Sequence, residues 1–524
     1  MKEYRDNYYG SILDPLHGDI KLSEIEKWCL GQPLFSRLRY VKQNTFLYYI
    51  FPSANHTRFE HSIGVMHMAS KIFDSCKENY ATGQRKKEKY NITGKSFFDI
   101  RTLGVNEPVY FQELRLAALF HDIGHGPMSH LFDEFAISKS VFLRLISETS
   151  VLRKYESGFE AMIAKEKNVA HETLSCAFIF FLIDKLKTTA NKDTHKFSDS
   201  ANQVIQQLSA ERIVKMLEPD FGGLKDGLLD SVGNDYTGFF SKIITAFPID
   251  ADRMDYLIRD SYFSGVTYGI YDLNRIYSSF QAKCENNQVD LVYKESGSDS
   301  MLRFIQSRSH LYNQVYFHKT NRAVNTMLTY ATKSIREADH KLLDSSKTFE
   351  ELVDFYVANS DEYFIKSTIK NKELLPNEVS VLKELIRRKL FKRVYGKKII
   401  LTGLKDKVKE KQKELKAIKG NIEAKLQELK HQGIYAAVDY YENDTFKDAG
   451  NKSVSLAKKE GKYYVFLQDW KQVGKDFDMS DMVVCTIRIY IRRTFHNSAE
   501  FDSFSNCVRN AVSEEINIIE AYRD

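Results

Sequence analysis

The sequence is poor in proline, in paired cysteines and in long apolar runs. Only eight prolines occur in 524 residues, so long helices can run uninterrupted. The six cysteines show neither a CxxC pair nor a disulfide-like spacing, which argues against a cysteine metal site and favours free thiols in a reducing compartment. They are Cys29, Cys76, Cys176, Cys284, Cys485 and Cys507.

No segment has the pattern of a membrane or export signal. The longest apolar run, 176–183, is far too short to cross a bilayer. The opening segment MKEYRDNYYG lacks the apolar core of a signal peptide. We therefore expect a soluble, cytoplasmic protein that has no membrane partner.

Neither sign of charge dominates. Lys and Arg number 76 against 70 Asp and Glu, and the net charge of +6 suits small anionic ligands without demanding nucleic acid. Apolar side chains make up 43% of the residues and aromatic ones 13%, which excludes a disordered chain. A chain of this length usually forms more than one core.

The spacing of apolar residues predicts a mainly α protein. Up to about residue 396 they recur at three- and four-residue intervals, as at Leu114, Ala118 and Phe120, and little resembles a strand. The glycines and proline of the following GHGP segment end that helix and place His125 and His130 on a turn. We expect an all-helical domain over residues 1–396.

Two further segments are predicted. Residues 397–432 form a charged amphipathic helix with Lys411 in its apolar stripe and Gly420 within it, so packing on its own domain or on a second subunit is favoured over a coiled coil. The stripe consists of Leu404, Val408, Leu415, Ile418, Ile422, Leu426 and Leu429. KYYVFLQDW and MVVCTIRIYIRRTF are typical of strands and predict a small α/β lobe over 433–524.

Histidines and aspartates in three separated segments predict a metal centre. His61 lies in TRFEHSIGV, His121 and Asp122 in ALFHDIGHGPMSH, and Asp252 in PIDADRMDYLIRD. A divalent metal needs several imidazoles and carboxylates that converge from distant segments, and this set is sufficient to activate a water. Arg58 shares a helix face with His61 and could contact a phosphate.

Simpler explanations exist for each segment. A histidine at a helix end is often a satisfied surface group, and Arg58 could pair with Glu60 on the surface. Asp250 and Asp252 could favour a helix start through capping and the helix dipole. Capping does not explain why Asp252, Tyr256 and Asp260 recur every four residues beside bulky apolar residues, so Tyr256 and Asp260 are predicted substrate contacts.

The order of these residues is the H…HD…D pattern of the HD superfamily of metal-dependent phosphohydrolases. The segments DPLHGDIKL, FSRLRYVKQ, FPSANHTRFEHSIGV, LFHDIGHGPMSH and DADRMDYLIRD resemble the deoxynucleoside triphosphate triphosphohydrolases within it. The resemblance covers residues 10–335 strongly and continues weakly into the carboxy-terminal lobe. It implies an all-helical HD-domain core followed by a small α/β lobe.

The resemblance also implies a reaction and its cofactors. Water attacks the α-phosphate of a deoxynucleoside triphosphate and releases a deoxynucleoside and intact triphosphate. The ligands His61, His121, Asp122 and Asp252 hold one transition metal, iron, manganese or zinc, and magnesium accompanies the phosphates. Members of the family form homo-oligomers, and a nucleotide activator is an expected partner.

Position by position, the resemblance assigns further roles. His125 is the candidate proton donor or water-orienting group, His130 and His171 face the phosphates, and Arg58 clamps the α-phosphate. Arg308 and Lys319 are placed near the phosphate tail. On the sugar side, Tyr316 lies beside the sugar, Gln43 contacts its hydroxyl, and Tyr256 stacks so as to reject a ribose hydroxyl.

The chain departs from the vertebrate members of the family at several positions. Phe317 stands where an amide residue reaches the base, which leaves the base preference open. Leu13, Gly31 and Ser36 replace polar contacts to a guanine activator, although Arg39 is retained. Activation by a guanine nucleotide is therefore not expected, and another nucleotide could take its place.

Two other functions stay open. An HD centre also suits a nucleotide phosphatase or a phosphodiesterase acting on a signalling nucleotide. Arg58, Arg308 and Lys319 favour a long polyphosphate, which a monophosphatase would not need. RRKLFKRVYGKK and the Lys-rich helix could instead bind nucleic acid, but acidic residues interleave with these lysines, and most such runs are solvated faces.

Overall fold

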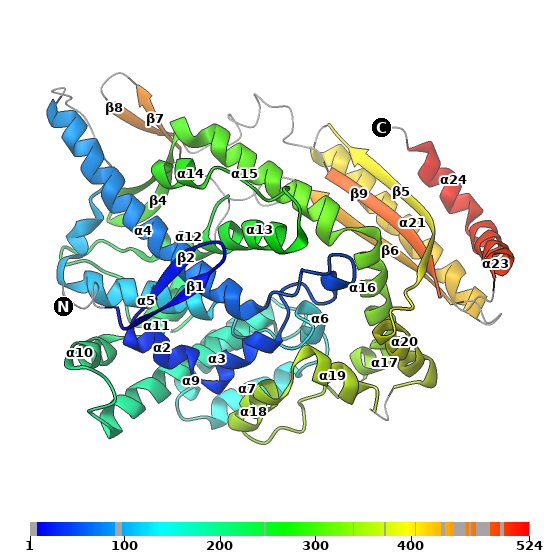
Figure 1. Ribbon diagram of the computed structural model, residues 1–524, viewed down its shortest axis with the longest axis horizontal. Helices are drawn as coiled ribbons and strands as arrows, with labels where there is room; N and C mark the ends of the chain where they lie inside the picture. Colours follow the sequence, from blue (N-terminus) through cyan, green and yellow to red (C-terminus); the bar gives the residue numbers. More distant parts are fainter. Residues whose placement is uncertain are drawn as a thin grey trace.

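The computed structural model describes residues 8–89, 97–245, 248–338, 340–370, 374–403, 405–430, 435–444, 456–460, 463–467, 483–492 and 497–522. Helices dominate these residues, which confirms the prediction of a mainly α protein (Figure 1). The long helix α4 (Arg58–Lys89) packs against α5 (Glu107–Phe120) and α13 (Ala251–Ser264). These three helices carry the predicted metal ligands, so their packing brings the ligands together.

Helix α5 is buried along almost its whole length. Every side chain from Pro108 to Phe120 is buried, as expected of a helix that is apolar on all sides. Its two buried charges are neutralised, since Arg115 pairs with Glu26 and Glu113 pairs with Arg212. The helix ends at Phe120, and His121 follows as its C-cap.

Two hairpins lie within the region predicted to be helical. Strands β1 (Gly10–Asp14) and β2 (Gly18–Leu22) pair antiparallel, as do β3 (Phe280–Glu285) and β4 (Gln288–Lys294). The second hairpin turns through Asn286 and Asn287, whose φ angles of 51° and 58° suit a tight two-residue turn. The expectation of little strand here is confirmed, but the sequence analysis located neither hairpin, because strands this short have too few residues for a clear alternation of apolar and polar side chains.

A second hydrophobic core lies toward the carboxyl terminus. Strands β5 (Lys392–Leu401), β9 (Val483–Ile491) and β6 (Ala436–Asp444) form an antiparallel sheet in the order β5-β9-β6. Helices α21 (Lys405–Lys430), α23 (Ser498–Ala511) and α24 (Ser513–Ala521) pack with it (Figure 1). The predicted strand segment MVVCTIRIYIRRTF contains β9 of this sheet. The segment KYYVFLQDW contains β8 (Tyr463–Leu467), which pairs with β7 (Leu456–Glu460), and β7 extends the β3–β4 sheet and not this one. Residues 462, 468–470, 482 and 493–495 of the two segments lie outside the described residues.

The amphipathic helix packs within this second core. Its stripe residues from Val408 to Leu429 are buried against the sheet and the last two helices, whereas Leu404 lies outside the described residues. Several lysines of α21 pair with acidic groups of the same region, including Lys416 with Glu442 and Lys425 with Glu515. These ion pairs favour a solvated helix face over a nucleic-acid surface. The domain boundaries at 396 and 432 stay a prediction.

Strands β9 and β6 of this sheet bind the segment that follows α15 (Ser298–Leu311). Arg488 Nη1 donates a hydrogen bond of 2.8 Å to the Phe317 carbonyl, and the Tyr490 hydroxyl donates one of 2.7 Å to the Lys319 carbonyl. Arg322, on α16 (Lys319–Ala331), forms an ion pair with Asp439 on β6. Among the described helices, none has an apolar stretch of the length needed to cross a bilayer.

Candidate metal centre

The four predicted metal ligands converge from three helices. His61 lies in the first turn of α4, His121 and Asp122 follow α5, and Asp252 lies in the first turn of α13. His61 Nε2 lies 3.1 Å from Asp252 Oδ1 and 3.8 Å from Asp122 Oδ2. His121 Nε2 lies 3.7 Å from Asp252 Oδ1 and 3.5 Å from Asp122 Oδ1. The structure thus brings all four together, and their role as ligands stays a prediction.

The hydrogen bond of His121 leaves its Nε2 atom for a cation. His121 Nδ1 lies 2.8 Å from the Ala118 carbonyl, which can only accept, so Nδ1 carries the proton and Nε2 carries a lone pair. This Nε2 atom is buried and has no hydrogen-bond partner. A buried orphan nitrogen beside carboxylates fits a divalent transition metal, for which imidazole and carboxylate are ordinary ligands.

Asp255 orients His61, a role that the sequence analysis did not assign to it. Its Oδ2 accepts a hydrogen bond of 2.8 Å from His61 Nδ1, and its other partners are Arg259 and His17. Although burial opposes ionisation, Arg259 and the hydrogen bonds from His17 and His61 hold the pKa of Asp255 well below its ordinary value. Its place three residues after Asp252, on the same helix face, was the available signal.

Gly64 makes room for this contact. A Cβ atom at position 64 would lie 1.9 Å from Asp255 Oδ1 and 2.6 Å from Arg259 Nη2, so only glycine fits there. Gly124, in the turn after His121 and Asp122, also leaves room for a close contact, because a Cβ atom there would lie 2.1 Å from the His171 carbonyl oxygen. Both glycines allow the site-bearing segments to approach closely.

Arg58 lies beside the predicted centre. Its Nη1 donates to Asp122, and its Nη2 donates a 3.0 Å hydrogen bond to Ser129 Oγ. Although burial opposes ionisation, Arg58 and His121 keep the pKa of Asp122 well below its ordinary value. An ionised Asp122 paired with a guanidinium provides both a carboxylate for a metal and a cation for a phosphate. The surface pairing of Arg58 with Glu60 is excluded, since Arg58 is buried and Glu60 accepts from Thr57.

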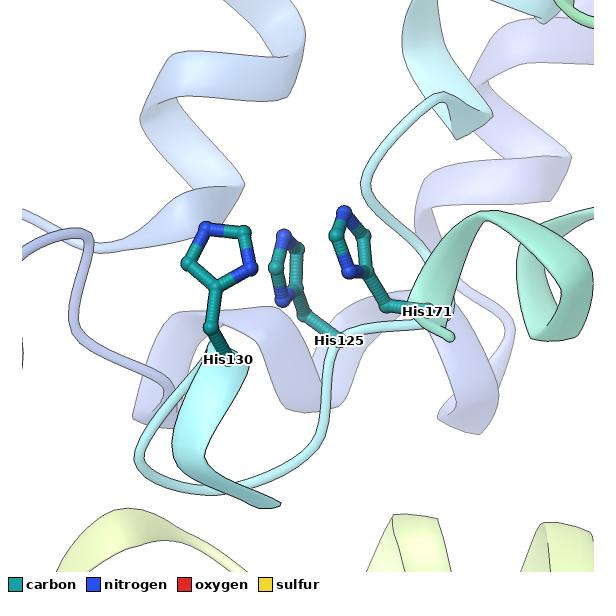
Figure 2. Close-up of side chains that lie close together, drawn as sticks. All are labelled: His125, His130 and His171. Carbon is teal, nitrogen blue, oxygen red and sulfur yellow. The ribbon is translucent and has the colours of Figure 1, made fainter. Parts of the chain in front are cut away.

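Three further histidines lie close to one another (Figure 2), and His125 connects them to this centre through Asp122. His125 comes from the turn after α5, His130 begins α6 (His130–Asp133) and His171 begins α9 (His171–Lys192). Ligand atoms of the three lie within 4.8 Å of one another. The His125 and His171 rings are stacked with centroids 3.6 Å apart and an interplanar angle of 16°. Imidazole lone pairs lie in the ring plane, so one ion cannot bind both rings well, and this cluster suits hydrogen bonding to an anion better.

Asp133 orients His171, and Asp122 orients His125. Asp133 Oδ2 lies 3.1 Å from His171 Nδ1, and Asp122 Oδ1 lies 3.4 Å from His125 Nε2. Burial lowers the pKa of His171, but the hydrogen bond to Asp133 and the nearby Glu172 outweigh it and raise the pKa overall. His125 Nδ1 is buried without a hydrogen-bond partner, as expected of a ring that awaits a ligand.

The predicted sugar-side residues form a second group. Asp260 is buried, lies 2.6 Å from His56 Nε2 through its Oδ1, and accepts from the Tyr316 hydroxyl. Tyr316 ends a π-helical turn, Tyr312–Tyr316, and its ring contacts the Tyr312 ring at 4.8 Å. In the described structure Asp260 therefore fixes Tyr316, and His56 is a member of the group that sequence reasoning missed. Arg308 lies over the Tyr312 ring at 4.9 Å.

The remaining predicted residues lie in different surroundings. Gln43 is partly buried, and its Oε1 atom has no hydrogen-bond partner. Tyr256 is partly buried beside Tyr312 and Arg308. Lys319 is exposed at the start of α16, and Phe317 packs on Tyr441 with ring centroids 4.1 Å apart.

The segment that aligns with a guanine-activator site lies near the surface. Leu13, on strand β1, is 83% exposed and is therefore not a core residue. Arg39 is also exposed and lies over the Phe59 ring at 3.4 Å.

Comparisons with known proteins show what this chain is similar to. Residues 58–189 match the HD domain, a range that includes His61, His121, Asp122 and His171. The chain is 29% identical over 381 residues to an uncharacterized protein of Methanocaldococcus jannaschii, covering 73% of this chain and 58% of the relative. It is 26% identical over 401 residues to the deoxynucleoside triphosphate triphosphohydrolase SAMHD1 of Homo sapiens, covering 73% of this chain and 54% of that protein. Residues 58–189 are thus similar to the HD domain, and the relatives of the chain include a deoxynucleoside triphosphate triphosphohydrolase.

Two further similarities bear on its extent and fold. An uncharacterized protein of Bacillus subtilis, YwfO, is 29% identical over 324 residues, covering 60% of this chain and 53% of the relative. The chain thus spans little more than half the length of these curated relatives. The crystal structure of a hypothetical protein from Aquifex aeolicus superposes with a TM-score of 0.56 at 23% identity, covering 96% of this chain and 99% of that one. That similarity supports the fold alone.

Proposed function

We propose that the protein is a metal-dependent hydrolase that converts deoxynucleoside triphosphates to deoxynucleosides and intact triphosphate. The observation that carries the proposal is the shared wall between the metal centre and the phosphate-facing groups, because Asp122 contacts both His121 and the Arg58 guanidinium. A substrate whose reacting phosphorus lies at the centre would find a guanidinium and three imidazoles close to it. Relatives named as deoxynucleoside triphosphate triphosphohydrolases support this substrate class.

His61, His121, Asp122 and Asp252 would hold the metal. A divalent transition metal at such a site supplies Lewis-acid activation of water at neutral pH. Iron, manganese and zinc all suit the mixed imidazole and carboxylate set, and magnesium would accompany the triphosphate oxygens. Asp255 and the Ala118 carbonyl fix the ring orientations, so that both Nε2 atoms face the same point.

The protein groups around the centre have separate tasks. Arg58 neutralises charge on the α-phosphate, and His130 and His171 donate hydrogen bonds to phosphate oxygens. His125 supplies a proton to the 5′-oxygen of the departing deoxynucleoside, or orients the water. Water adds to the α-phosphorus, the bond from that phosphorus to the 5′-oxygen breaks, and the products are a deoxynucleoside and triphosphate.

Selection of the deoxy sugar depends on the predicted sugar-side residues Gln43, Tyr256 and Tyr316. Gln43 Oε1 is a buried acceptor without a partner, which suits a ligand hydroxyl. The bond from Tyr316 to Asp260 holds the tyrosine ring beside Tyr256, and a ribose hydroxyl would have to clash there or lose a hydrogen bond. Arg308 and Lys319 would meet the outer phosphates, and Phe317 leaves the base preference open.

Assembly and regulation are part of the same proposal. We expect identical subunits to associate, with a nucleotide other than a guanine nucleotide as the activator. A cytoplasmic location fits six free cysteines.

The test is a product analysis with metal control. Purified protein is incubated with each of the four deoxynucleoside triphosphates, singly and in pairs, in the presence of manganese or iron and of magnesium. Asp122→Asn should abolish triphosphate release, and Asp184→Asn, an exposed carboxylate on α9, should not. Release of monophosphate, pyrophosphate or single phosphates would instead identify a different nucleotide hydrolase and refute the reaction.

A further inference from the structure

Asp361 joins two segments of the candidate site. It is the first residue of α19 (Asp361–Thr368), and its side chain is buried. Its Oδ2 accepts a hydrogen bond of 2.8 Å from the Lys42 amide, and its Oδ1 accepts one of 2.8 Å from the Met128 amide. One carboxylate from the distant α19 segment therefore binds the backbone on both sides of the site.

Capping of its own helix does not explain this carboxylate. The N-cap of α19 is Ser360, whose hydroxyl accepts from the Tyr363 amide at 3.2 Å. That serine already satisfies the first turn, and both Asp361 oxygens turn to other parts of the chain. Burial raises the pKa of Asp361 overall, and the two amides and the nearby Arg58 oppose that shift only in part.

The two amides belong to segments that bear predicted contacts. Lys42 precedes Gln43, whose own amide donates to the His56 carbonyl at 3.2 Å. Met128 and Ser129 have φ angles of 64° and 56°, a left-handed conformation that non-glycine residues rarely adopt unless their surroundings impose it. Ser129 accepts from Arg58, and His130 follows directly.

We propose that Asp361 is a positioning residue that sets the separation between the sugar-side segment at Gln43 and the phosphate-side turn at Ser129 and His130. The inference rests on the proposed function for its catalytic consequence. Asp361 hydrogen-bonds to none of the four predicted metal ligands, since both its oxygens are used by backbone amides. Its loss should therefore disturb substrate placement and leave the metal in place.

The chain offers a matched control in Asp344. This half-buried carboxylate also binds two backbone amides, with Oδ1 2.8 Å from the Ser138 amide and Oδ2 2.9 Å from the Lys341 amide. Neither amide adjoins a predicted site residue. An asparagine at either position presents an NH2 group to one amide and loses the same kind of charge-assisted bond.

The experiment compares Asp361→Asn, Asp344→Asn and Asp361→Glu with the unmodified full chain. Hydrogen exchange measured by mass spectrometry should show faster exchange in peptides containing Lys42 and Met128 for Asp361→Asn alone. Metal content should stay at the wild-type value. The kcat/KM for a deoxynucleoside triphosphate should fall about tenfold or more in Asp361→Asn, and Asp361→Glu, which keeps both acceptors, should recover part of it.

Each outcome decides a separate question. Unchanged exchange at Lys42 and Met128, or unchanged kcat/KM despite faster exchange, overturns the positioning role. Loss of bound metal from Asp361→Asn also overturns it, because the effect would then act through the metal centre. If the unmodified protein releases no triphosphate, the proposed function fails. The role of Asp361 is then tested by the exchange data and by calorimetry, which compares the binding of inorganic triphosphate to Asp361→Asn and to the unmodified protein. If Asp361→Asn does not fold, Asp361→Glu decides by the same three measurements.

Discussion

Asp255 Oδ2 lies 2.8 Å from Nδ1 of His61, so the ring of one predicted metal ligand is held by a carboxylate on the opposite helix. This contact links α13 to α4 directly behind the metal centre. A carboxylate behind a ligand histidine fixes the ring and raises its basicity toward a metal. The first prediction follows from this pair.

Asp255→Asn should weaken metal binding by about 10- to 100-fold, the usual cost of removing the group behind a ligand histidine. The measurement is metal affinity by competition with a chelator. His17→Asn is the control, because His17 also hydrogen-bonds to Asp255, through Oδ1, without touching the predicted centre. Equal loss of metal affinity in both variants would show that Asp255 acts on general stability and has no specific effect through His61.

Gly64→Ala should disturb the same contact sterically. The new methyl group would lie 1.9 Å from Asp255 Oδ1, so that carboxylate or the helix must shift, at a cost of roughly 1–3 kcal/mol in unfolding free energy. Gly83→Ala lies on the same helix with nothing within 4 Å, and it should stabilise the protein by up to about 1 kcal/mol. Thermal unfolding and metal content of the two variants check this. A neutral Gly64→Ala would contradict the packing described.

Tyr490→Phe should loosen the first turn of α16. The variant removes the hydrogen bond to the Lys319 carbonyl, worth about 1 kcal/mol, so we expect KM for the nucleotide to rise roughly fivefold with a smaller change in kcat. Tyr440→Phe is the control, since that hydroxyl binds Glu442 on the same sheet. Steady-state kinetics of both variants decide whether the second core holds the substrate segment; equal values for the two would show that it does not.

Glu218 should make stability depend on pH. Burial, together with Glu172 and Glu166, raises the pKa of Glu218 from its ordinary 4.5 to about 7. Between these values the folded protein keeps a proton that the unfolded chain releases, so stability falls as pH rises through this window and the loss is complete above pH 7. Glu218→Gln should flatten the dependence by up to about 3 kcal/mol.

Melting temperatures from pH 4.5 to 8 test this, with the exposed Glu160→Gln on α8 (Glu156–Ala164) as the control. The wild type and the control should lose stability in parallel as pH rises, and Glu218→Gln should not. A Glu218→Gln curve that follows the wild type would place the titration elsewhere.

Part of the site could be predicted from the sequence because its residues occur in compact segments with unusual composition. His121, Asp122, His125 and His130 fall within ten residues, and Asp252 follows an evident helix start. The supporting groups could not be predicted in the same way. Asp361 contacts Met128 across 233 residues, and such a pairing depends on packing that no local pattern records.

The fold, too, has parts that a local sequence pattern predicts and parts that it does not. Long helices such as α4 and α5 and the strand β9 have enough residues for their periodicity to appear, whereas the hairpins β1–β2 and β3–β4 do not. Asp260 illustrates a limit of residue-type reasoning, since a polar stripe on a helix predicted a substrate contact and the structure shows a buried carboxylate fixing Tyr316 and His56. Its contact with substrate stays a prediction.

The central claim concerns where water attacks. Hydrolysis of a deoxynucleoside triphosphate in ¹⁸O-labelled water, followed by mass spectrometry of the products, tests it most directly. Our account predicts one ¹⁸O atom in the released triphosphate and none in the deoxynucleoside, with no label incorporation in Asp122→Asn. Label in pyrophosphate, in single phosphate or in the nucleoside 5′-hydroxyl would contradict attack at the α-phosphorus.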